Sequence, residues 1–340
     1  MKERIRDLYA GAVSGFVFPF HEQLKGHSST RVLRKLERTQ WLERGALNDL
    51  RLARLEQLLE HAGTRVPYYR DLVRDRDLPF RGLRSLGELA HWPLLTKRII
   101  REQLDRLKSE SGVKLMRFNT GGSTGEPLVF FLGRERVSHD VAAKRRATRW
   151  WGVDIGDPEI VLWGSPIELG SQDRLRAFRD RILRSRLLPA FDMSEQRLAQ
   201  FTATVLKLRP RMLFGYPSAL ALLARHAEDA GADFSRCGIR VAFVTGERLY
   251  EEQREDIQRV FGCPVANGYG GRDAGFVAHE CPAGGLHIMA EDLVVEVLDE
   301  AGCAVPDGTA GEIVVTHLAT SDFPFIRYRT GDIGTLDDLP

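Results

Sequence analysis

The feature that most constrains the fold is an alternation of short apolar runs with amphipathic stretches beyond the first third of the chain. The runs 128–132, 160–163 and 241–244 are predicted strands, and glycine turns separate them from helical patterns such as 198–208 and 219–230. Strands that alternate with helices favour a sheet with helices on its faces. We therefore predict an α/β fold with largely buried strands.

The pattern becomes strand-rich after Gly285. Residues 293–298 alternate between apolar and polar, 302–308 carry turn residues, and 312–316 are again largely apolar. Two alternating segments around a turn predict a β-hairpin.

The first 110 residues are predicted to be helical. Apolar residues recur every three or four positions from 47 to 62, and Gly63 follows as a stop signal. A helix boundary is expected at Val66, because a residue before proline is pushed out of the α region. The predicted domains are a helical segment, 1–110, packed on the body and a core, 111–340, that is α/β over 111–284 and β-rich over 285–340.

Composition limits the class of protein. The chain has 340 residues, 43% of them hydrophobic, which is enough for a sizeable core. The net charge of +2 gives no concentrated basic field of the kind that a nucleic-acid-binding protein shows. Four scattered cysteines form no C-x-x-C pair, which favours a reducing cytoplasm over a disulfide framework.

The apolar stretch from Leu8 to Phe20 is shorter than a membrane span and contains Pro19. Its small residues stand at the start of the apolar run, which argues against a cleavable signal peptide. One interpretation is an amphipathic helix packed on the body, and the other is a peripheral membrane anchor.

Residues 174–186 contain six arginines, and this basic stretch also has two interpretations. It fits a solvated helix face, or a surface that contacts CoA phosphates, an acidic partner or a membrane. Its residues are Arg174, Arg176, Arg179, Arg181, Arg184 and Arg186.

The strongest local motif is the segment Thr120-Gly121-Gly122-Ser123-Thr124-Gly125-Glu126-Pro127. Its glycines allow a tight turn whose N–H groups point at one anion, and its hydroxyls add donors to phosphate oxygens. It lacks the Gly-Lys-Ser/Thr of a Walker A loop, and a strand follows it instead of a helix. A plain polar hairpin turn remains the alternative.

Two later segments carry similar chemistry. In Asn267-Gly268-Tyr269-Gly270-Gly271-Arg272-Asp273, an aromatic ring between glycines can lie against a purine, and the acid can reach Mg²⁺. In Ile326-Arg327-Tyr328-Arg329-Thr330-Gly331-Asp332, an aspartate after glycine can accept hydrogen bonds from ribose hydroxyls. Each segment taken alone is also compatible with an ordinary glycine-rich loop or turn.

Together, in this order, the three segments resemble the ANL superfamily of adenylate-forming enzymes, and more narrowly the phenylacetate-CoA ligase family with its capsular-polysaccharide-associated relatives. The motif Val66-Pro67-Tyr68-Tyr69, with Leu94-Leu95-Thr96-Lys97 after it, is also similar to that family. So are His279-Glu280-Cys281, Gly285-Leu286-His287-Ile288 and Glu291-Asp292. The resemblance extends over nearly the whole chain. It implies the large ANL domain, with stacked α/β sheets and a small β-rich, barrel-like subdomain.

The resemblance also implies a role for particular residues. The phosphate loop would contain Thr120, Gly122, Ser123, Thr124 and Gly125, with Thr124 acting in catalysis. The adenine site would contain Gly246, Glu247, Asn267, Gly268, Tyr269 and Gly270, with Tyr269 stacked on the base. Asp273 would be catalytic and hold Mg²⁺, and Asp332 would bind the ribose. Trp163, Tyr216 and Pro217 are expected to line the acid pocket.

Some positions depart from the family pattern. Gly121 stands where the family commonly has serine, and Glu126 stands where lysine or threonine is frequent. Asp273 replaces a glutamate and is one methylene shorter. In the family a lid domain with a catalytic lysine follows the ribose-binding aspartate, whereas this chain stops at Pro340. We therefore expect the C-terminal lid domain to be absent here, through truncation or because a lid is encoded separately.

The reaction that the resemblance implies is ATP-dependent activation of a carboxylic acid to an acyl-adenylate, followed by transfer to CoA. Without a lid, this chain is expected to bind nucleotide but to adenylate slowly. The alternatives are a weak or non-catalytic nucleotide-binding module, and adenylation for transfer to a polysaccharide or another non-CoA acceptor. A homodimer is a further expectation. His279, Cys281 and His287 are expected to pack in the interior, with a zinc site as the alternative.

Overall fold

In the computed structural model, residues 2–120, 127–164 and 173–337 are described. They divide into two compact units, each built from segments that are not contiguous in sequence. Unit 1 comprises Met1–Lys25, Lys144–Gly270 and Ala278–His287. Unit 2 comprises Gly26–Ala143, Gly271–Val277 and Ile288–Pro340. The boundaries of these units differ from the predicted domain boundaries at residues 110 and 284. The division of the chain into domains at those two residues stays a prediction.

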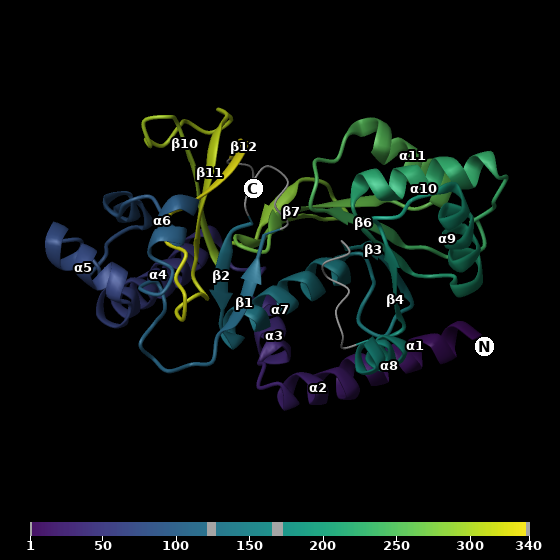
Figure 1. Ribbon diagram of the computed structural model, residues 1–340, viewed down its shortest axis with the longest axis horizontal. Helices are drawn as coiled ribbons and strands as arrows, with labels where there is room; N and C mark the ends of the chain where they lie inside the picture. Colours follow the sequence, from purple (N-terminus) through teal and green to yellow (C-terminus); the bar gives the residue numbers. More distant parts are fainter. Residues whose placement is uncertain (1, 121–126, 165–172, 338–340) are drawn as a thin grey trace. The chain divides into compact units, whose positions relative to one another are not determined.

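The α/β prediction is confirmed by a seven-stranded sheet, in the order β4-β3-β5-β6-β7-β8-β9, most of which belongs to unit 1 (Figure 1). Strands β4, β3, β5, β6 and β7 are parallel to one another. The strands of this sheet are β3 Glu159–Trp163, β4 Ser185–Pro189, β5 Met212–Gly215, β6 Val241–Thr245, β7 Val265–Gly271, β8 Gly275–Glu280 and β9 Leu286–Ile288.

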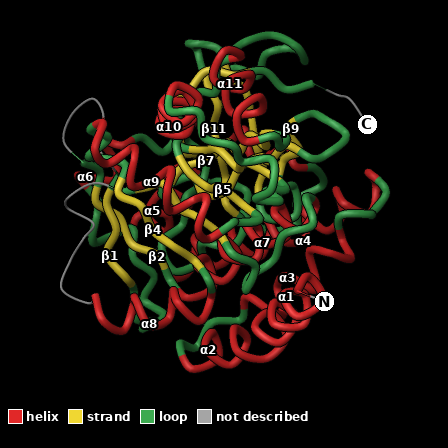
Figure 2. The backbone as a smooth tube through the Cα atoms, turned by 90° about the vertical axis from the view of Figure 1, so that its right-hand side faces the viewer, coloured by secondary structure: helices red, strands yellow, loops and turns green. Residues whose placement is uncertain are grey.

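Helices connect these parallel strands, as right-handed crossovers between parallel strands require. Figure 2 shows α10 and α11 beside the yellow strands of the sheet. The helices of unit 1 are α1 Lys2–Ala12, the π-helix η1 Val13–Val17, α2 Phe18–Leu24, α8 Asp173–Leu183, α9 Glu195–Leu208, α10 Pro217–Asp229 and α11 Glu251–Phe261. Helix α7, Arg134–Trp150, contributes residues to both units.

The sheet of unit 1 is buried on both faces. Leu213 and Ala242 pack with α9, α10 and α11 in one apolar cluster. Their neighbours Phe214 and Phe243 belong to another cluster, which includes Ala147 of α7. Successive strand residues point to opposite faces. This burial on both faces explains why the strands are nearly continuous apolar runs instead of alternating ones.

Unit 2 combines helices with two small antiparallel sheets. The helices are α3 Ser29–Thr39, α4 Arg44–Arg65, α5 Pro67–Arg76, the 3₁₀ helix η2 Leu86–His91 and α6 Lys97–Glu102. One sheet pairs β1 Met116–Asn119 with β2 Val129–Leu132. The other has the order β10-β11-β12, formed by Leu293–Leu298, Gly311–His317 and Tyr328–Gly334.

Several sequence predictions about these elements are confirmed. The helical pattern at 47–62 lies within α4, and the predicted boundary at Val66 is the point where α4 ends and α5 begins. The predicted hairpin is present, with Val295 paired to Val315 in antiparallel register. We expected the β-rich part to be barrel-like. Its described residues contain an open sheet of three strands. Three strands are too few to close into a barrel.

One prediction about the basic stretch was wrong. Helix α8 ends at Leu183, and Arg184 adopts a left-handed backbone with φ 56°. Arg186 then lies on strand β4, paired with Ile160. Arg184 and Arg186 therefore do not belong to one helix face with the earlier arginines. The short apolar run that follows them pairs with a buried neighbouring strand, and this pairing overrides the helical periodicity.

Candidate functional site

Predicted site residues occur in both units. In unit 1 they follow the carboxyl ends of neighbouring parallel strands: Trp163 ends β3, Tyr216 follows β5, and Gly246 follows β6. In register, Leu162 is paired with Gly215, and Gly215 with Val244. The carboxyl ends of these strands therefore meet at one sheet edge, which is where α/β sheets bind ligands.

Two aromatic rings lie stacked at this edge. The rings of Trp163 and Tyr216 have centroids 4.2 Å apart and an interplanar angle of 17°. Gly246 lies beside both rings in a left-handed conformation with φ +85°. A Cβ at Gly246 would lie 3.1 Å from a ring atom of each aromatic residue. Glycine is required here both by the backbone conformation and by the close approach of the rings.

Glu247 is held at the start of a helix. Its Oε2 accepts a hydrogen bond from Ser218 Oγ at 2.5 Å and one from the Ser218 backbone N–H at 3.4 Å. Ser218 lies in the first turn of α10, directly after Pro217. A carboxylate is favoured at this position by the unsatisfied N–H groups and the positive end of the helix dipole. The contact fixes the turn after β6 against the residues that follow β5.

The segment Asn267 to Gly270 lies in strand β7 and not in a loop. Gly268 faces Phe243, where a Cβ would come within 2.9 Å of the ring. The backbone N–H of Asn267 donates to Glu280 Oε2 at 2.8 Å. Glu280 is also ion-paired with Arg254 of α11 at 2.9 Å. These contacts fix the strand that carries Tyr269, whose ring is partly exposed.

In unit 2, Asp273 is held by a buried tyrosine. Its Oδ2 accepts a hydrogen bond from the Tyr328 hydroxyl at 2.6 Å, and its Oδ1 accepts one from the Ala274 N–H at 3.0 Å. Arg136 donates from Nη2 to the Asp273 carbonyl oxygen at 3.2 Å. The carboxylate is therefore oriented, and each oxygen retains a second lone pair for another ligand.

Asp332 lies on β12, four residues after Tyr328. Its backbone N–H donates to Thr330 Oγ1 at 3.1 Å, and the residue itself is exposed. Burial, then the charge of Asp273 and a smaller effect of Asp332, raise the pKa of the Tyr328 phenol. The phenol therefore stays protonated and keeps donating to Asp273. Tyr328 was missed as a site residue, although it stands inside the motif that contains Asp332.

The phosphate-loop residues Gly122, Ser123, Thr124 and Gly125 lie outside the described residues. The strands that flank this segment are antiparallel, and Thr120 closes the pair. Its N–H donates to the Leu128 carbonyl and its Oγ1 accepts from the Leu128 N–H, both at 3.0 Å.

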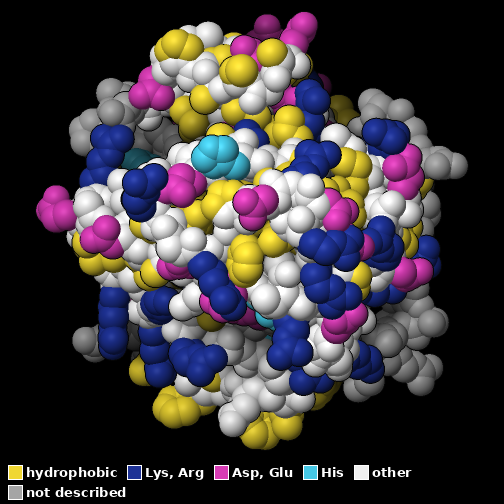
Figure 3. Space-filling view, turned by 90° about the vertical axis from the view of Figure 1, so that its left-hand side faces the viewer, with side chains coloured by type: hydrophobic (Ala, Val, Ile, Leu, Met, Phe, Trp, Pro, Cys, Tyr) yellow, Lys and Arg dark blue, Asp and Glu magenta, His cyan; other side chains and the backbone are white. Residues whose placement is uncertain are grey.

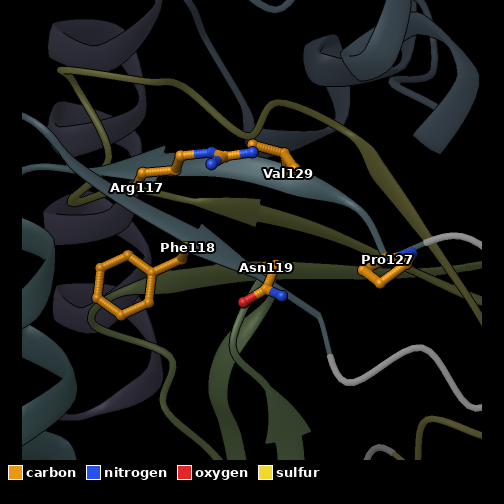
Figure 4. Close-up of a pocket in the computed structure, with 5 residues that line it drawn as sticks. All are labelled: Arg117, Phe118, Asn119, Pro127 and Val129. Carbon is orange, nitrogen blue, oxygen red and sulfur yellow. The ribbon is translucent and has the colours of Figure 1, made fainter. Parts of the chain in front are cut away.

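A pocket of about 410 Å³ lies in unit 2 and is lined by Arg117, Phe118, Asn119, Pro127 and Val129 (Figure 4). Figure 4 shows Asn119 and Pro127 at the ends of the strands that lead into the segment. Arg117 places a cation on the pocket wall. Arg117 was not predicted as a site residue, because no strand was predicted before Thr120.

The zinc interpretation gains no geometric support. His279 is fully buried, with its ring 5.8 Å from that of Phe243, and burial followed by the charge of Arg146 lowers its pKa to about 3. His287 is exposed and contacts the Gly284 carbonyl, as does the Cys281 thiol. Across residues 2–120, 127–164 and 173–337, no three His, Cys, Asp or Glu side chains form a metal-ligand group.

The fold of this chain is of the α/β class. Residues 185–320 match the family model described as AMP-binding enzyme. The chain is 26% identical over 296 residues to the protein CapK of Staphylococcus aureus, covering 86% of this chain and 64% of CapK. It is 26% identical over 300 residues to phenylacetate-coenzyme A ligase of Pseudomonas putida, covering 86% of this chain and 67% of that ligase.

The fold is also similar to that of solved structures. A 2-hydroxyisobutyryl-CoA ligase in the postadenylation state, in complex with 2-HIB-AMP, matches with a TM-score of 0.72 and 22% identity. The match covers 88% of this chain and 65% of that one. The chain is therefore similar to AMP-binding enzymes over residues 185–320, and to CapK and phenylacetate-coenzyme A ligase over most of its length. It spans about two thirds of the length of the curated relatives it matches.

Proposed function

We propose that this protein uses ATP to activate a carboxylic acid as an acyl-adenylate and then transfers the acyl group to CoA. The observation that carries the proposal is the orientation of Asp273 by Tyr328, on whose strand Asp332 also lies. These two aspartates are the positions at which the family resemblance requires a metal-binding and a ribose-binding group. The match of 185–320 to AMP-binding enzymes supports the same conclusion.

In the proposed reaction, an oxygen of the substrate carboxylate attacks the α-phosphorus of ATP. The bond from that phosphorus to the β-phosphate oxygen breaks, and pyrophosphate leaves. In the second step, the sulfur of the CoA thiolate attacks the acyl carbonyl carbon, and AMP leaves with the electrons of the mixed-anhydride bond. The contribution of the protein is mainly positioning and charge stabilisation.

In unit 1, we assign the adenine side of the nucleotide to Tyr269 and to the turn at Gly246 and Glu247. Tyr269 offers an aromatic face, and Gly246 lets the backbone pass close to the aromatic pair, which a side chain there would crowd. The stacked rings of Trp163 and Tyr216 offer an apolar surface for the acyl group, with Pro217 behind Tyr216. Apolar walls of this kind discriminate weakly between acids of similar size.

In unit 2, we assign the ribose to Asp332 and the metal ion to Asp273. Mg²⁺ prefers oxygen ligands and is commonly held by one or two carboxylates together with substrate phosphates. The oriented Asp273 carboxylate fits that requirement, and a bound Mg²⁺ would neutralise charge on the phosphates. Thr120, Ser123 and Thr124 are assigned to the phosphates, and Arg117 supplies a nearby cation.

Several finer expectations belong to this proposal. Adenylation by the 340-residue chain is expected to be slow, and a separately supplied lid domain is expected to accelerate it. A homodimer and a cytoplasmic location are also proposed. All four cysteines are free of disulfide bonds, which agrees with a reducing compartment. In the described part of the chain, no helix combines the length and apolarity needed to cross a bilayer.

The proposal is tested by ATP–pyrophosphate exchange with a panel of aryl and aliphatic acids. One acid class is expected to stimulate exchange, and chelation of Mg²⁺ is expected to abolish it. Asp332→Ala is expected to lose MgATP binding and exchange, whereas Asp307→Ala, a change at an exposed aspartate in the turn between β10 and β11, should retain both.

The acceptor is identified by product analysis. Formation of acyl-CoA on addition of CoA supports the proposal. An adenylate that forms but is not consumed by CoA would favour the second candidate, transfer to a polysaccharide or another acceptor. MgATP binding without exchange, in the presence of every acid and of a supplied lid domain, would reduce the protein to a nucleotide-binding module.

A further inference from the structure

The first helical segment of unit 1 carries an exposed apolar row. Helix α1, the π-helix η1 and α2 follow one another without a break from Lys2 to Leu24. Exposed apolar residues recur along them in steps of four. They are Leu8, which is 74% exposed, Ala12, Phe16 at 79%, Phe20 at 63% and Leu24 at 72%.

The π-helical turn reduces the winding of this row around the helix. In an α-helix with 3.6 residues per turn, each step of four residues rotates the side chain by about 40°. Four such steps would wind the row almost halfway around the helix. The wider turn of η1, at Val13–Val17, takes back part of that rotation. The row from Leu8 to Leu24 therefore stays on one side over roughly 24 Å.

The opposite side of the same helices already packs on unit 1. Ala10, Val13 and Phe18 are buried, and the Arg145 guanidinium lies 5.0 Å from the Phe18 ring. The α1–η1–α2 segment therefore has two apolar faces. One packs against the rest of unit 1, and the other is the exposed row. Extended exposed apolar surface of this kind marks an interaction site.

Charge is distributed unequally around the row. The Asp7 side chain, which is 57% exposed, precedes the row and is ion-paired with Arg211 at 2.6 Å, and Glu22 is buried. No carboxylate therefore stands among the exposed residues between Leu8 and Lys25. An apolar row without acids is compatible with a negatively charged surface.

Helix α8 adds basic and apolar groups alongside. The Tyr9 hydroxyl donates to the Ile182 carbonyl oxygen at 2.9 Å, and the Arg184 guanidinium lies 3.8 Å from the Tyr9 ring. α8 exposes Phe178 (65% exposed) and Arg181. Lys25 is exposed at the other end of the row. Figure 3 shows hydrophobic side chains exposed on one face of the molecule, some of them at its lower edge.

We propose that this row docks on the surface of an anionic lipid bilayer. The α1–η1–α2 segment lies in the plane of the membrane, with Leu8, Phe16, Phe20 and Leu24 inserted at the boundary between headgroups and acyl chains. Lys25 and Arg181 face the anionic headgroups. An apolar row with flanking cations and with no exposed acid between Leu8 and Lys25 is the pattern of an in-plane amphipathic helix.

The test is co-sedimentation of the full chain with vesicles of phosphatidylcholine, alone or with about one third phosphatidylglycerol. The protein is expected to pellet with the anionic vesicles and to be released in part by salt. Phe16→Ser/Phe20→Ser should lower the partition coefficient at least about tenfold, because two large apolar side chains no longer insert. Lys25→Glu/Arg181→Glu should weaken binding to anionic vesicles selectively.

The matched control is Leu222→Ser, which changes an exposed apolar residue on α10 that is 39% exposed. It should pellet like the unaltered chain. Both serine variants should keep the native circular dichroism spectrum and ATP–pyrophosphate exchange, so that membrane docking and the proposed catalysis are measured independently.

Protein that stays in the supernatant with both vesicle types would overturn the proposal, as would equal binding by the Phe16→Ser/Phe20→Ser variant. Light scattering tests whether a second copy of the chain covers the row instead of a membrane. Self-association that this double variant abolishes, together with absent vesicle binding, would assign the row to contacts between two copies of the chain.

Discussion

At the scale of single residues, the candidate site depends on side chains that hold other side chains. Tyr328 orients Asp273, Ser218 binds Glu247, and Gly246 leaves space for two rings. Of these, the sequence indicated Asp273, Glu247 and Gly246 through the motifs that contain them. It did not indicate Tyr328 or Ser218, because their roles depend on which residues the fold brings beside them.

Tyr328→Phe is expected to lower the rate of ATP–pyrophosphate exchange about tenfold, because it removes the 2.6 Å hydrogen bond that orients Asp273. The concentration of Mg²⁺ needed for half-maximal exchange should rise. The phenylalanine ring keeps its packing against Phe325, so the free energy of unfolding should change little. Tyr250→Phe, at an exposed tyrosine, serves as the control. An unchanged Mg²⁺ dependence in Tyr328→Phe would contradict the positioning role.

Gly246→Ala is expected to destabilise the chain by about 1–3 kcal/mol, because alanine is strained at positive φ. It should also weaken binding of ATP or acid, because the new methyl group displaces the rings of Trp163 and Tyr216. Gly231→Ala separates these two effects. Gly231 has a φ of +67° with open space around it, so its alanine variant should lose stability alone. Thermal unfolding and ligand titration of both variants measure the difference.

At the scale of elements, β7 shows how pairing overrides local preference. Its segment Asn267–Gly271 contains three glycines, which are depleted in strands. It is nevertheless a strand, because β6 pairs with it in parallel and Glu280 of β8 binds the Asn267 N–H. β10, by contrast, was predicted with its observed ends, because its alternation is local information. The strand Met212–Gly215 was not predicted from the sequence.

Glu280→Ala is expected to reduce the free energy of unfolding by about 2 kcal/mol, since it removes a charged partner from Arg254 and an acceptor from Asn267. Because β7 carries Tyr269, affinity for ATP should fall as well. The control is Glu102→Ala, which removes an exposed ion pair with Arg98 and should cost less than about 1 kcal/mol. Urea unfolding compares them, and equal losses would refute the role of Glu280 in fixing β7.

At the scale of the whole molecule, buried ionisable groups link stability to pH. Burial, then the charge of Arg146, lowers the pKa of His279 to about 3, and burial, then the charge of Arg136, lowers that of His317 to about 4. In the unfolded chain both imidazoles titrate near 6.5. The folded protein therefore binds fewer protons than the unfolded chain between these values.

Stability is consequently expected to be fully present above pH 6.5 and to fall as the pH decreases toward 4. Each histidine should contribute a loss of up to about 1 kcal/mol per pH unit. His279→Gln should show a smaller loss between neutral and mildly acidic pH, and His91→Gln, at an exposed histidine, should not. Denaturant unfolding over this range measures the slopes. Identical slopes for all three proteins would mean that the pKa of His279 is the same in the folded and the unfolded state.

The sequence by itself determined the class of fold, several strands and helices such as 160–163, 241–244, 47–62 and 219–230, and the motifs that carry the family resemblance. These depend on hydropathy periodicity and on residue types at short spacing, which a chain carries locally. Only the tertiary structure decided that Tyr328 holds Asp273, that glycine-rich β7 is a strand, and that each unit is assembled from separate segments. The physical reason is that hydrogen bonding and packing between distant residues select among the conformations that local sequence leaves open.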